Sequence, residues 1–399
     1  MQLSERLNTP ISTAELERRW AAVRRAMEME KIDVLLMQNN NDHMGGYVKY
    51  FSDLPATNGY PITLVFPRDD DMTLIGQGPF GMVKDLPHEG DGIRRGVKRW
   101  MTTPSYASAP YTASYDSDLA AEALAPYSGG TIGLVGPYQM SVAVVDHLRR
   151  GRLSNAKFVD TSDLVDRIKV VKSAEEKELV IRAARMQDGA MRAAFGALEP
   201  GMRDADVAAI AQCYSQRHGS ENGIYLCSSA PLSTPTQIAQ RHYQNRVIRE
   251  GDYVLLLVED NGPGGMYTEL GRTAVVGKVP QAMKEEFAFT LEARRFTLNL
   301  LKPGTPCKTV WEEYNAFMRR NGRPEEARLY CHGQGYDLVE RPLVRHDEPM
   351  TIEKDMNIVV HPTYTHKDIS SWVCDNYLIE ANGPGERLHH FPEEIVELG

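Results

Sequence analysis

Apolar residues recur at helical and strand spacings along the first part of the chain. In 13–30, Leu16, Trp20, Val23 and Met27 lie three or four positions apart, which predicts an amphipathic helix, and the run 32–37 predicts a buried strand after it. The same patterns predict strands at 62–66, 72–75 and 131–135 and helices at 116–124 and 140–149. The stretch 87–114, rich in Gly, Pro, Ser and Tyr, is expected to be a long loop. This alternation indicates an α/β domain over residues 1–160.

A different pattern begins after residue 160. A connecting helix is expected at 161–171, and Ser173 with Glu176 has the spacing of a capping box that opens a long helix to about residue 198. Further helices are expected at 204–216, 281–301 and 309–321, and strands at 253–258, 271–276, 357–364 and 372–379. Runs of helices and runs of strands, without strict alternation, indicate an α+β domain over residues 161–399.

Composition and charge narrow the class of protein. The 399 residues are 42% hydrophobic, enough for buried cores, and 45 Lys and Arg against 54 Asp and Glu give a net charge of −9, which argues against nucleic acid as a partner. The mean hydropathy is −0.41 and no run of 18 apolar residues or signal-peptide pattern occurs, so we expect a cytoplasmic protein without a membrane partner. Five cysteines outside CxxC pairs argue against a disulfide framework or a zinc ribbon.

Five motifs in the second domain occur in an order that resembles the pita-bread family of creatinase, proline-specific aminopeptidases and methionine aminopeptidase. Residues 172–176 are similar to the helix that opens the family's domain, and 200–202 to its PGM turn. Residues 241–243 with 251–252 are similar to its PHY and GD step, 265–273 to its GYxxDxxRT strand, and 331–335 to its GHGxG loop. The resemblance implies an α+β pita-bread domain behind a smaller α/β creatinase-type domain, and a homodimer, as the relatives usually are.

The resemblance also assigns candidate metal ligands. Metallopeptidases of this family hold two ions on two Asp eleven residues apart, one His and two Glu. These positions fall on Val258, Glu269, His332, His361 and Cys374. Val258 cannot coordinate, whereas the other four side chains can, and one carboxylate with one thiolate balances a single divalent ion. The pattern therefore predicts one divalent transition metal ion, Zn²⁺ ahead of Fe- or Mn-like ions.

A hairpin argument supports the pairing of His361 and Cys374 independently of the resemblance. The midpoint between them lies between Lys367 and Asp368, at a polar position suited to a turn. A hairpin turning there would place His361 opposite Cys374, with Cβ atoms about 5 Å apart. A slip of one residue would bring Asp375 towards the site instead.

The resemblance implies acid/base and substrate-binding residues as well. His242 is similar to the family histidine that faces the reacting bond and is the principal acid/base of creatinase, and an imidazole can transfer a proton near neutral pH. Glu340 is a second acid/base candidate, because the second histidine of the family's loop is absent here. The candidate substrate-binding residues are Tyr47, Tyr50, Tyr243 and Arg272.

Plainer interpretations stand beside these assignments. Cys374 could be a small buried apolar residue, and Glu269 could form a salt bridge with Arg272, three positions on. Tyr47 and Tyr50 could be core aromatics. The acidic pair 259–260, which flanks Val258, is expected in a surface turn in preference to a ligand role.

Together these features predict a hydrolase that acts on a C–N bond, of amide or amidine type, in a small polar molecule, with one metal ion and His242 as the acid/base. The main alternative is a metal-independent, creatinase-like hydrolase in which Glu269 and His361 bind the substrate. An Xaa-Pro-type peptidase, a C–N or C–S lyase on the same fold, and a non-catalytic binding protein remain open.

Overall fold

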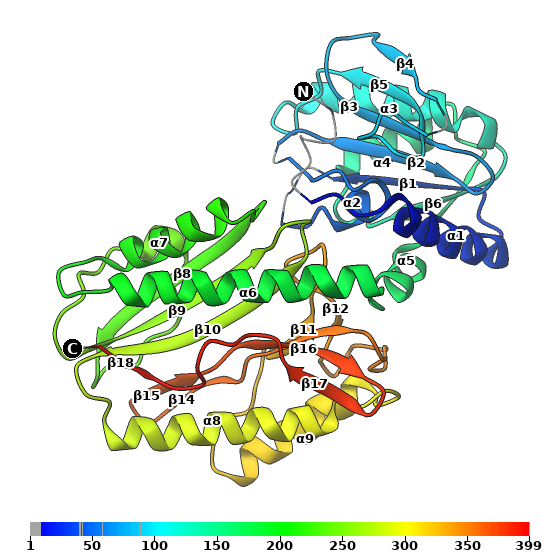
Figure 1. Ribbon diagram of the computed structural model, residues 1–399. Helices are drawn as coiled ribbons and strands as arrows, with labels where there is room; N and C mark the ends of the chain where they lie inside the picture. Colours follow the sequence, from blue (N-terminus) through cyan, green and yellow to red (C-terminus); the bar gives the residue numbers. More distant parts are fainter. Residues whose placement is uncertain (1–8, 40, 42, 58, 88, 399) are drawn as a thin grey trace. The chain divides into compact units, whose positions relative to one another are not determined.

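The computed structural model describes residues 9–39, 41, 43–57, 59–87 and 89–398. The chain divides into two compact units, Met1–Lys169 and Val170–Gly399 (Figure 1). The helix expected at 161–171 forms as Ser162–Lys169 and belongs to the first unit, whereas the predicted boundary after residue 160 had placed it in the second.

The first unit is built on a seven-stranded mixed sheet of order β4-β5-β3-β2-β1-β6-β7. The strands are β1 (Val34–Asn39), β2 (Ile62–Pro67), β3 (Met72–Gln77), β4 (Val83–Asp85), β5 (Val97–Thr103), β6 (Thr131–Val135) and β7 (Lys157–Asp160). The helices are α1 (Thr13–Glu30), α2 (Gly46–Ser52), α3 (Ala113–Leu124), α4 (Val142–Arg150) and α5 (Ser162–Lys169), with short 3₁₀ turns η2 (Pro110–Thr112) and η3 (Ala125–Tyr127). The predicted helix at 13–30 coincides with α1, which begins where the Ser12 hydroxyl accepts from the Glu15 amide.

The prediction of one long loop over 87–114 is wrong. Strand β5 lies inside this stretch and pairs in parallel with β3 and antiparallel with β4. Its sequence mixes Lys98, Arg99 and Trp100 with apolar residues, so its side chains show no clean alternation. Hydrogen bonds to a strand on each edge therefore stabilise β5, although its local sequence pattern does not predict a strand.

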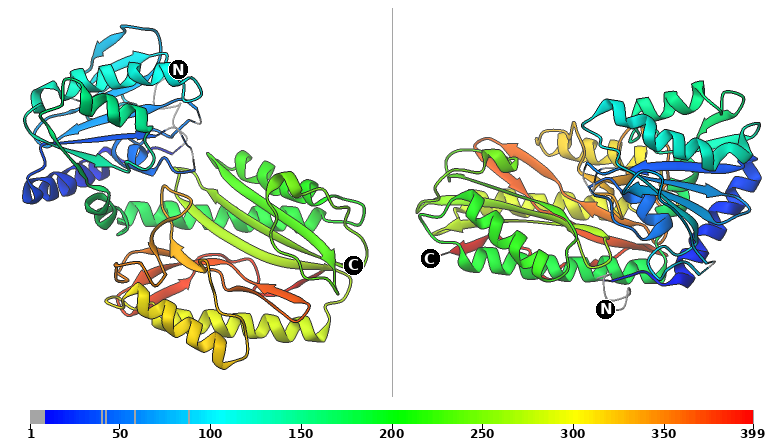
Figure 2. Two further views of the ribbon diagram at one scale, coloured as in Figure 1. Left: turned by 180° about the vertical axis from the view of Figure 1, so that it is seen from behind. Right: turned by 90° about the horizontal axis from the view of Figure 1, so that it is seen from above.

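The second unit contains two main sheets, each covered by a pair of helices (Figures 1 and 2). The first sheet has the order β18-β10-β9-β8 and the second β12-β11-β13-β16-β17, and β14 and β15 form a separate hairpin. The strands are β8 (Gly223–Pro231), β9 (Asp252–Asn261), β10 (Tyr267–Val276), β11 (Cys331–Gly333), β12 (Glu340–Leu343), β13 (Asn357–Val360), β14 (Thr363–His366), β15 (Ile369–Trp372), β16 (Asp375–Glu380), β17 (Gly383–Arg387) and β18 (Val396–Leu398). The helices are α6 (Ala174–Ala197), α7 (Asp204–Arg217), α8 (Gln281–Leu300) and α9 (Cys307–Arg320), with the 3₁₀ turn η4 (Arg241–Tyr243).

Apolar faces fix how the helices cover these sheets. Helices α6 and α7 bury Phe195 and Val207 in one core with Val258 and Leu270 of the first sheet. Helix α9 packs against the second sheet in another core. The predicted capping box forms at the start of α6, where the Ser173 hydroxyl accepts from the Glu176 amide. This mixed arrangement is the predicted α+β fold.

The hairpin predicted around residues 367–368 is present. Strands β14 and β15 pair His366 with Ile369, and β13 and β16 keep the same register, so that Val360 pairs with Asp375. Residues 361 and 374 lie between the two ladders and belong to neither, and Cys374 forms a bridge to Gly271 of β10. Among the described residues, no helix is long and apolar enough to cross a membrane.

Candidate metal centre

Three side chains from three separate chain segments converge in the second unit. Glu269 lies in β10, His332 in β11 and His361 directly after β13. One donor atom of each lies within 4.8 Å of the other two, and all three residues are buried. The Nε2 atom of His332 is 3.7 Å from a carboxylate oxygen of Glu269, and the two imidazole centroids are 5.3 Å apart. We call these residues the donor trio.

Both histidines of the trio present a neutral imidazole. The Nδ1 atom of His332 lies 2.9 Å from the Gly333 carbonyl oxygen, which can only accept, so Nδ1 carries the proton and Nε2 the lone pair. Burial lowers the pKa of His332 to about 4 and the pKa of His361 well below its ordinary value. The Nε2 atom of His361 is buried and has no hydrogen-bond partner among the described residues. Such an orphaned nitrogen beside a carboxylate fits a metal ligand.

A second carboxyl group faces the trio, and the sequence had not placed it there. Glu259 of β9 is the direct cross-strand partner of Glu269, and both are 6% exposed. Burial and the charge of Glu269 raise the pKa of Glu259 well above its ordinary value, and burial raises that of Glu269 to about 7. The expectation that 259–260 form a surface turn is therefore wrong. Val258 points to the opposite face, into the core against α6 and α7.

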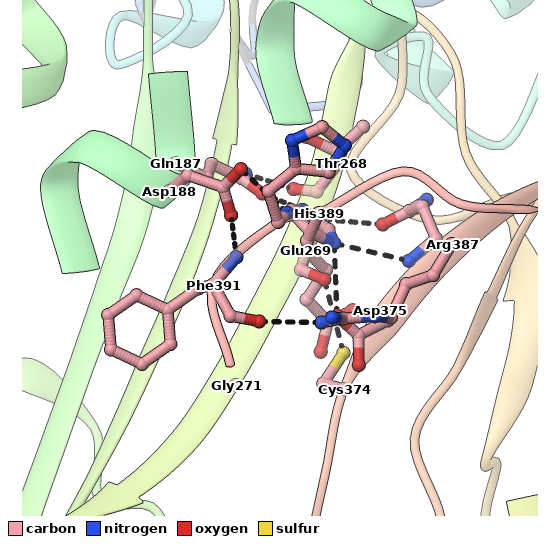
Figure 3. Close-up of polar contacts among 12 residues, drawn as sticks. Gln187, Asp188, Thr268, Glu269, Gly271, Cys374, Asp375, Arg387, His389 and Phe391 are labelled. Atoms are coloured by element: carbon pink, nitrogen blue, oxygen red, sulfur yellow. Dashed lines mark hydrogen bonds and ion pairs between the residues drawn. The ribbon is translucent and has the colours of Figure 1, made fainter. Parts of the chain in front are cut away.

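Cys374 lies next to the trio without joining it. Its Sγ donates to the backbone oxygen of Glu269 at 3.4 Å (Figure 3). Backbone hydrogen bonds also link Cys374 to Gly271, which draws this segment onto β10. Burial, with the charges of Glu269 and Asp375, raises the pKa of the thiol well above its ordinary value. The structure therefore brings together three of the four predicted ligands, with the Cys374 thiol beside the Glu269 carboxyl and Glu259 as a second acidic residue of the same cavity.

The two acid/base candidates lie outside this group. His242 is exposed on the 3₁₀ turn η4, where its ring centroid is 4.2 Å from that of Tyr243, which is 70% exposed. Glu340 forms a buried ion pair with Lys172. None of the three is among the described residues that line the cavity at the trio. This placement gives no support to the acid/base roles of His242 and Glu340 or to substrate binding by Tyr243.

The other predicted substrate-binding residues, Tyr47, Tyr50 and Arg272, are buried. In the first unit, Tyr50 is fully buried and the Tyr47 hydroxyl donates to Asp166 at 2.8 Å. In the second unit, Arg272 is 1% exposed and pairs with Asp375 at 2.8 Å, so it is no salt-bridge partner of Glu269.

Asp375, which Figure 3 draws with Cys374 and Arg387, is the centre of a buried ionic network in the second unit. Arg272, Arg294 and Arg387 all pair with its carboxylate. Burial raises its pKa, but Arg272, Arg294 and a hydrogen bond from His389 hold it far below the usual range. Arg272 also donates to the backbone oxygen of Cys374 at 3.0 Å. The network therefore anchors the strand that follows the predicted fourth ligand.

A cavity of about 670 Å³ opens onto the trio and Glu259. Half of its lining residues are apolar, namely Ile224, Leu226, Ile238, Leu257, Leu329, Leu338, Val339 and Trp372, and besides the trio and Glu259 the polar ones are Gln237, Glu326, Arg328 and Thr363. Arg328 carries the only guanidinium or ammonium group among the described lining residues, and no described acidic side chain forms an ion pair with it. Its positive charge contributes to the lowered pKa of both His332 and His361, which places its field on the trio. Neither Arg328 nor Glu259 was predicted to be part of a site.

The chain matches the model of metallopeptidase family M24 over residues 178–387 and belongs to that family. An Xaa-Pro dipeptidase of Pyrococcus furiosus is 24% identical over 276 residues, which cover 67% of this chain and 75% of that protein. An uncharacterised hydrolase/peptidase of Sinorhizobium fredii is 25% identical over 338 residues and 82% of each chain.

Solved structures confirm the fold over nearly the whole chain. The X-Pro aminopeptidase of Thermotoga maritima superposes with a TM-score of 0.78 at 17% identity, covering 95% of this chain and 99% of that one. The Xaa-Pro dipeptidase of Bacillus anthracis gives 0.75 at 19% identity, with 96% and 100% covered. The predicted family, pita-bread fold and enzyme class, a hydrolase of C–N bonds, are thereby confirmed.

Proposed function

We propose that this chain hydrolyses an amide-type C–N bond in a small anionic substrate, with one divalent transition metal ion held by Glu269, His332 and His361. The observation that carries the proposal is the convergence of three donor atoms within 4.8 Å, one of them a buried nitrogen without a partner among the described residues. Two neutral imidazoles and a carboxylate suit Zn²⁺ or an Fe- or Mn-like ion and are poor ligands for Mg²⁺ or Ca²⁺.

The residues around the trio have separate roles in charge balance, proton transfer and substrate contact. When bound, an ion of this kind polarises a carbonyl group or lowers the pKa of a bound water molecule. With a divalent cation bound, Glu259 would be ionised, so that Glu259 and Glu269 together would balance its charge. The oxygen of Glu259 that Gln334 does not hold is the position for a transferred proton, in place of His242. The apolar wall excludes water from the rest of the substrate.

Arg328 and the cavity support a substrate class. A guanidinium binds a carboxylate with two parallel hydrogen bonds, and Arg328 lines the cavity without an acidic partner among the described residues. Apolar side chains, among them Leu329, Leu338 and Trp372, line the same cavity. A substrate with a free carboxylate, an apolar body and an amide bond fits this arrangement. Because the chain resembles proteins named Xaa-Pro dipeptidase and dipeptidase, apolar dipeptides are the first compounds to test.

The test combines metal analysis with activity. Protein purified without chelators is expected to contain about one transition metal ion per chain, and to hydrolyse apolar dipeptides or N-acyl amino acids. His361→Gln should lose both the metal and the activity, whereas His346→Gln, which changes an exposed histidine, should lose neither. Mass analysis of the products shows whether water was added, as a hydrolase requires and a lyase does not.

The cross-strand pair Glu259–Glu269 favours a second candidate, a metal-independent hydrolase. Two adjacent buried carboxyl groups that share one proton can act as an acid and a base. Full turnover by protein stripped of metal would establish this candidate in place of the first. The homodimer and the cytoplasmic location stay predictions, and gel filtration with light scattering measures the former.

A further inference from the structure

Two buried carboxamides connect the two acidic residues of the site, and a third is bonded to them. Gln334 donates through Nε2 to Oε1 of Glu259 at 3.0 Å, and its Oε1 accepts from Nδ2 of Asn376 at 2.9 Å. Asn376 in turn accepts from the backbone N–H of Glu269 at 2.8 Å and donates to Asn357 at 3.0 Å. The three side chains are at most 1% exposed. We call Gln334, Asn376 and Asn357 the amide chain.

Backbone groups fix the direction of every amide in this chain. The N–H of Glu269 can only donate, so Asn376 must direct its oxygen to it and its nitrogen to Gln334. The carbonyl oxygen of Leu338 can only accept, and it receives the second hydrogen of Gln334 at 3.0 Å. A reversed Gln334 amide would set its oxygen against both Glu259 and Leu338. The orientation is therefore determined, and Glu259 faces a donor.

Two buried carboxyl groups placed directly opposite each other repel when both are charged. The two carboxyl groups also form a hydrogen bond with each other, which needs a shared proton, and Gln334 offers Glu259 a separate donor that does not depend on that proton. Asn376 connects this donor to the backbone of Glu269, so a single chain of hydrogen bonds sets both acidic residues.

We propose that Gln334 is a positioning residue: oriented by Asn376, its carboxamide holds the carboxylate of Glu259 opposite Glu269, where it completes the negative charge of the cation site. The part of this proposal that concerns the cation rests on the proposed function. The part that concerns the position of Glu259 does not.

The chain offers a matched control on the other face of β9. Gln187 of α6 is also fully buried, and its side chain donates at 2.7 Å to Asp260, the residue that follows Glu259 in β9. Successive residues of a strand point to opposite faces, so Gln187→Met and Gln334→Met each remove a carboxamide donor to an acidic residue of β9, on opposite sides of the strand. Gln187→Met also removes hydrogen bonds to the Thr268 oxygen and to His389. Only Gln334→Met touches a residue that lines the cavity.

The experiment measures Co²⁺ affinity, by competition with a chromophoric chelator, and crystal structures of the same proteins. In Gln334→Met we expect Glu259 to leave its position opposite Glu269 and Co²⁺ binding to weaken ~10–100-fold, the range for residues that support metal ligands. Gln187→Met should leave Glu259 in place and the affinity unchanged. Glu259 unmoved in Gln334→Met, or equal loss of affinity in both variants, would overturn the proposal.

A second variant tests the chain without changing Gln334. Asn376→Asp keeps the acceptor for Glu269 but sets an oxygen against Oε1 of Gln334, so the Gln334 amide reverses and repels Glu259. Charge alone would make this variant bind Co²⁺ more tightly, whereas the amide chain predicts weaker binding. The effect should disappear in the Gln334→Met background, and an equal effect in both backgrounds would refute the coupling. If wild type binds no Co²⁺, the metal proposal fails, and the position of Glu259 in the crystal structures still decides this one.

Discussion

Replacing His361 by leucine is expected to stabilise the metal-free protein. The Nε2 atom of His361 is buried and lacks a hydrogen-bond partner among the described residues. An unmet buried polar group costs about 1–3 kcal/mol, and a substitution of similar volume adds strain below about 1.5 kcal/mol. We therefore expect a net gain of about 1 kcal/mol. For a unit of this size that raises Tm by about 2–4 °C.

Zn²⁺ should make wild type more stable than His361→Leu, the reverse of the order expected without metal. Wild type with Zn²⁺ at about 100 times its Kd gains about 2.7 kcal/mol, whereas the variant, without one donor, gains much less. Thermal unfolding followed by circular dichroism, in EDTA and in Zn²⁺, measures both differences. His389→Leu is the control, because His389 is also buried but its Nε2 lies 2.9 Å from the Gln187 side-chain oxygen, so this variant should be less stable in both buffers. A leucine at 361 that destabilises the EDTA-treated protein, or equal stabilisation of both proteins by Zn²⁺, would refute the reasoning.

Three further predictions concern pH, substrate charge and the ionic network. Because burial lowers the pKa of His332 to about 4, the folded chain binds fewer protons than the unfolded chain below pH 6.5. The stability from this residue is therefore present above pH 6.5 and lost towards pH 4, by up to about 3 kcal/mol. Wild type in EDTA should lose more stability on acidification than His332→Asn. Equal losses in the two proteins would count against a lowered pKa of His332. Arg328→Leu should raise KM about tenfold or more for substrates with a free carboxylate and much less for their amides, and a uniform change would exclude the carboxylate contact. Arg272→Met should cost about 3–5 kcal/mol of stability, because it removes one of the cations that neutralise buried Asp375; an unchanged Tm would contradict that role.

Local signals predicted the elements that depend on local interactions. The helix at 13–30 and the capping box at Ser173 follow from spacing and capping within one segment, and both agree with the structure. The turn at residues 367–368 also needed only the symmetry of one hairpin. Strand β5 was missed because its order comes from two neighbouring strands distant in sequence.

The sequence also failed to predict single site residues whose positions depend on distant segments of the chain. A count of eleven residues back from Glu269 gave Val258, but the hairpin of β9 and β10 is centred on Gly264, which sets Glu259 opposite Glu269. The turn residues Pro263-Gly264-Gly265 mark the centre of this hairpin, and the symmetry argument that applies to the turn at 367–368 would give the pair Glu259–Glu269 here. The exposure of His242 and the amide contacts of Gln334 arise from tertiary packing, for which one sequence carries no local signal.

The most direct test of the central claim is anomalous diffraction from crystals of protein purified without chelators, recorded at the absorption edge of whichever metal elemental analysis detects. The account predicts one peak per chain, within coordination distance of the Glu269 carboxylate and the Nε2 atoms of His332 and His361. No peak at this position in crystals of fully active protein, or a peak held by other residues, would contradict it.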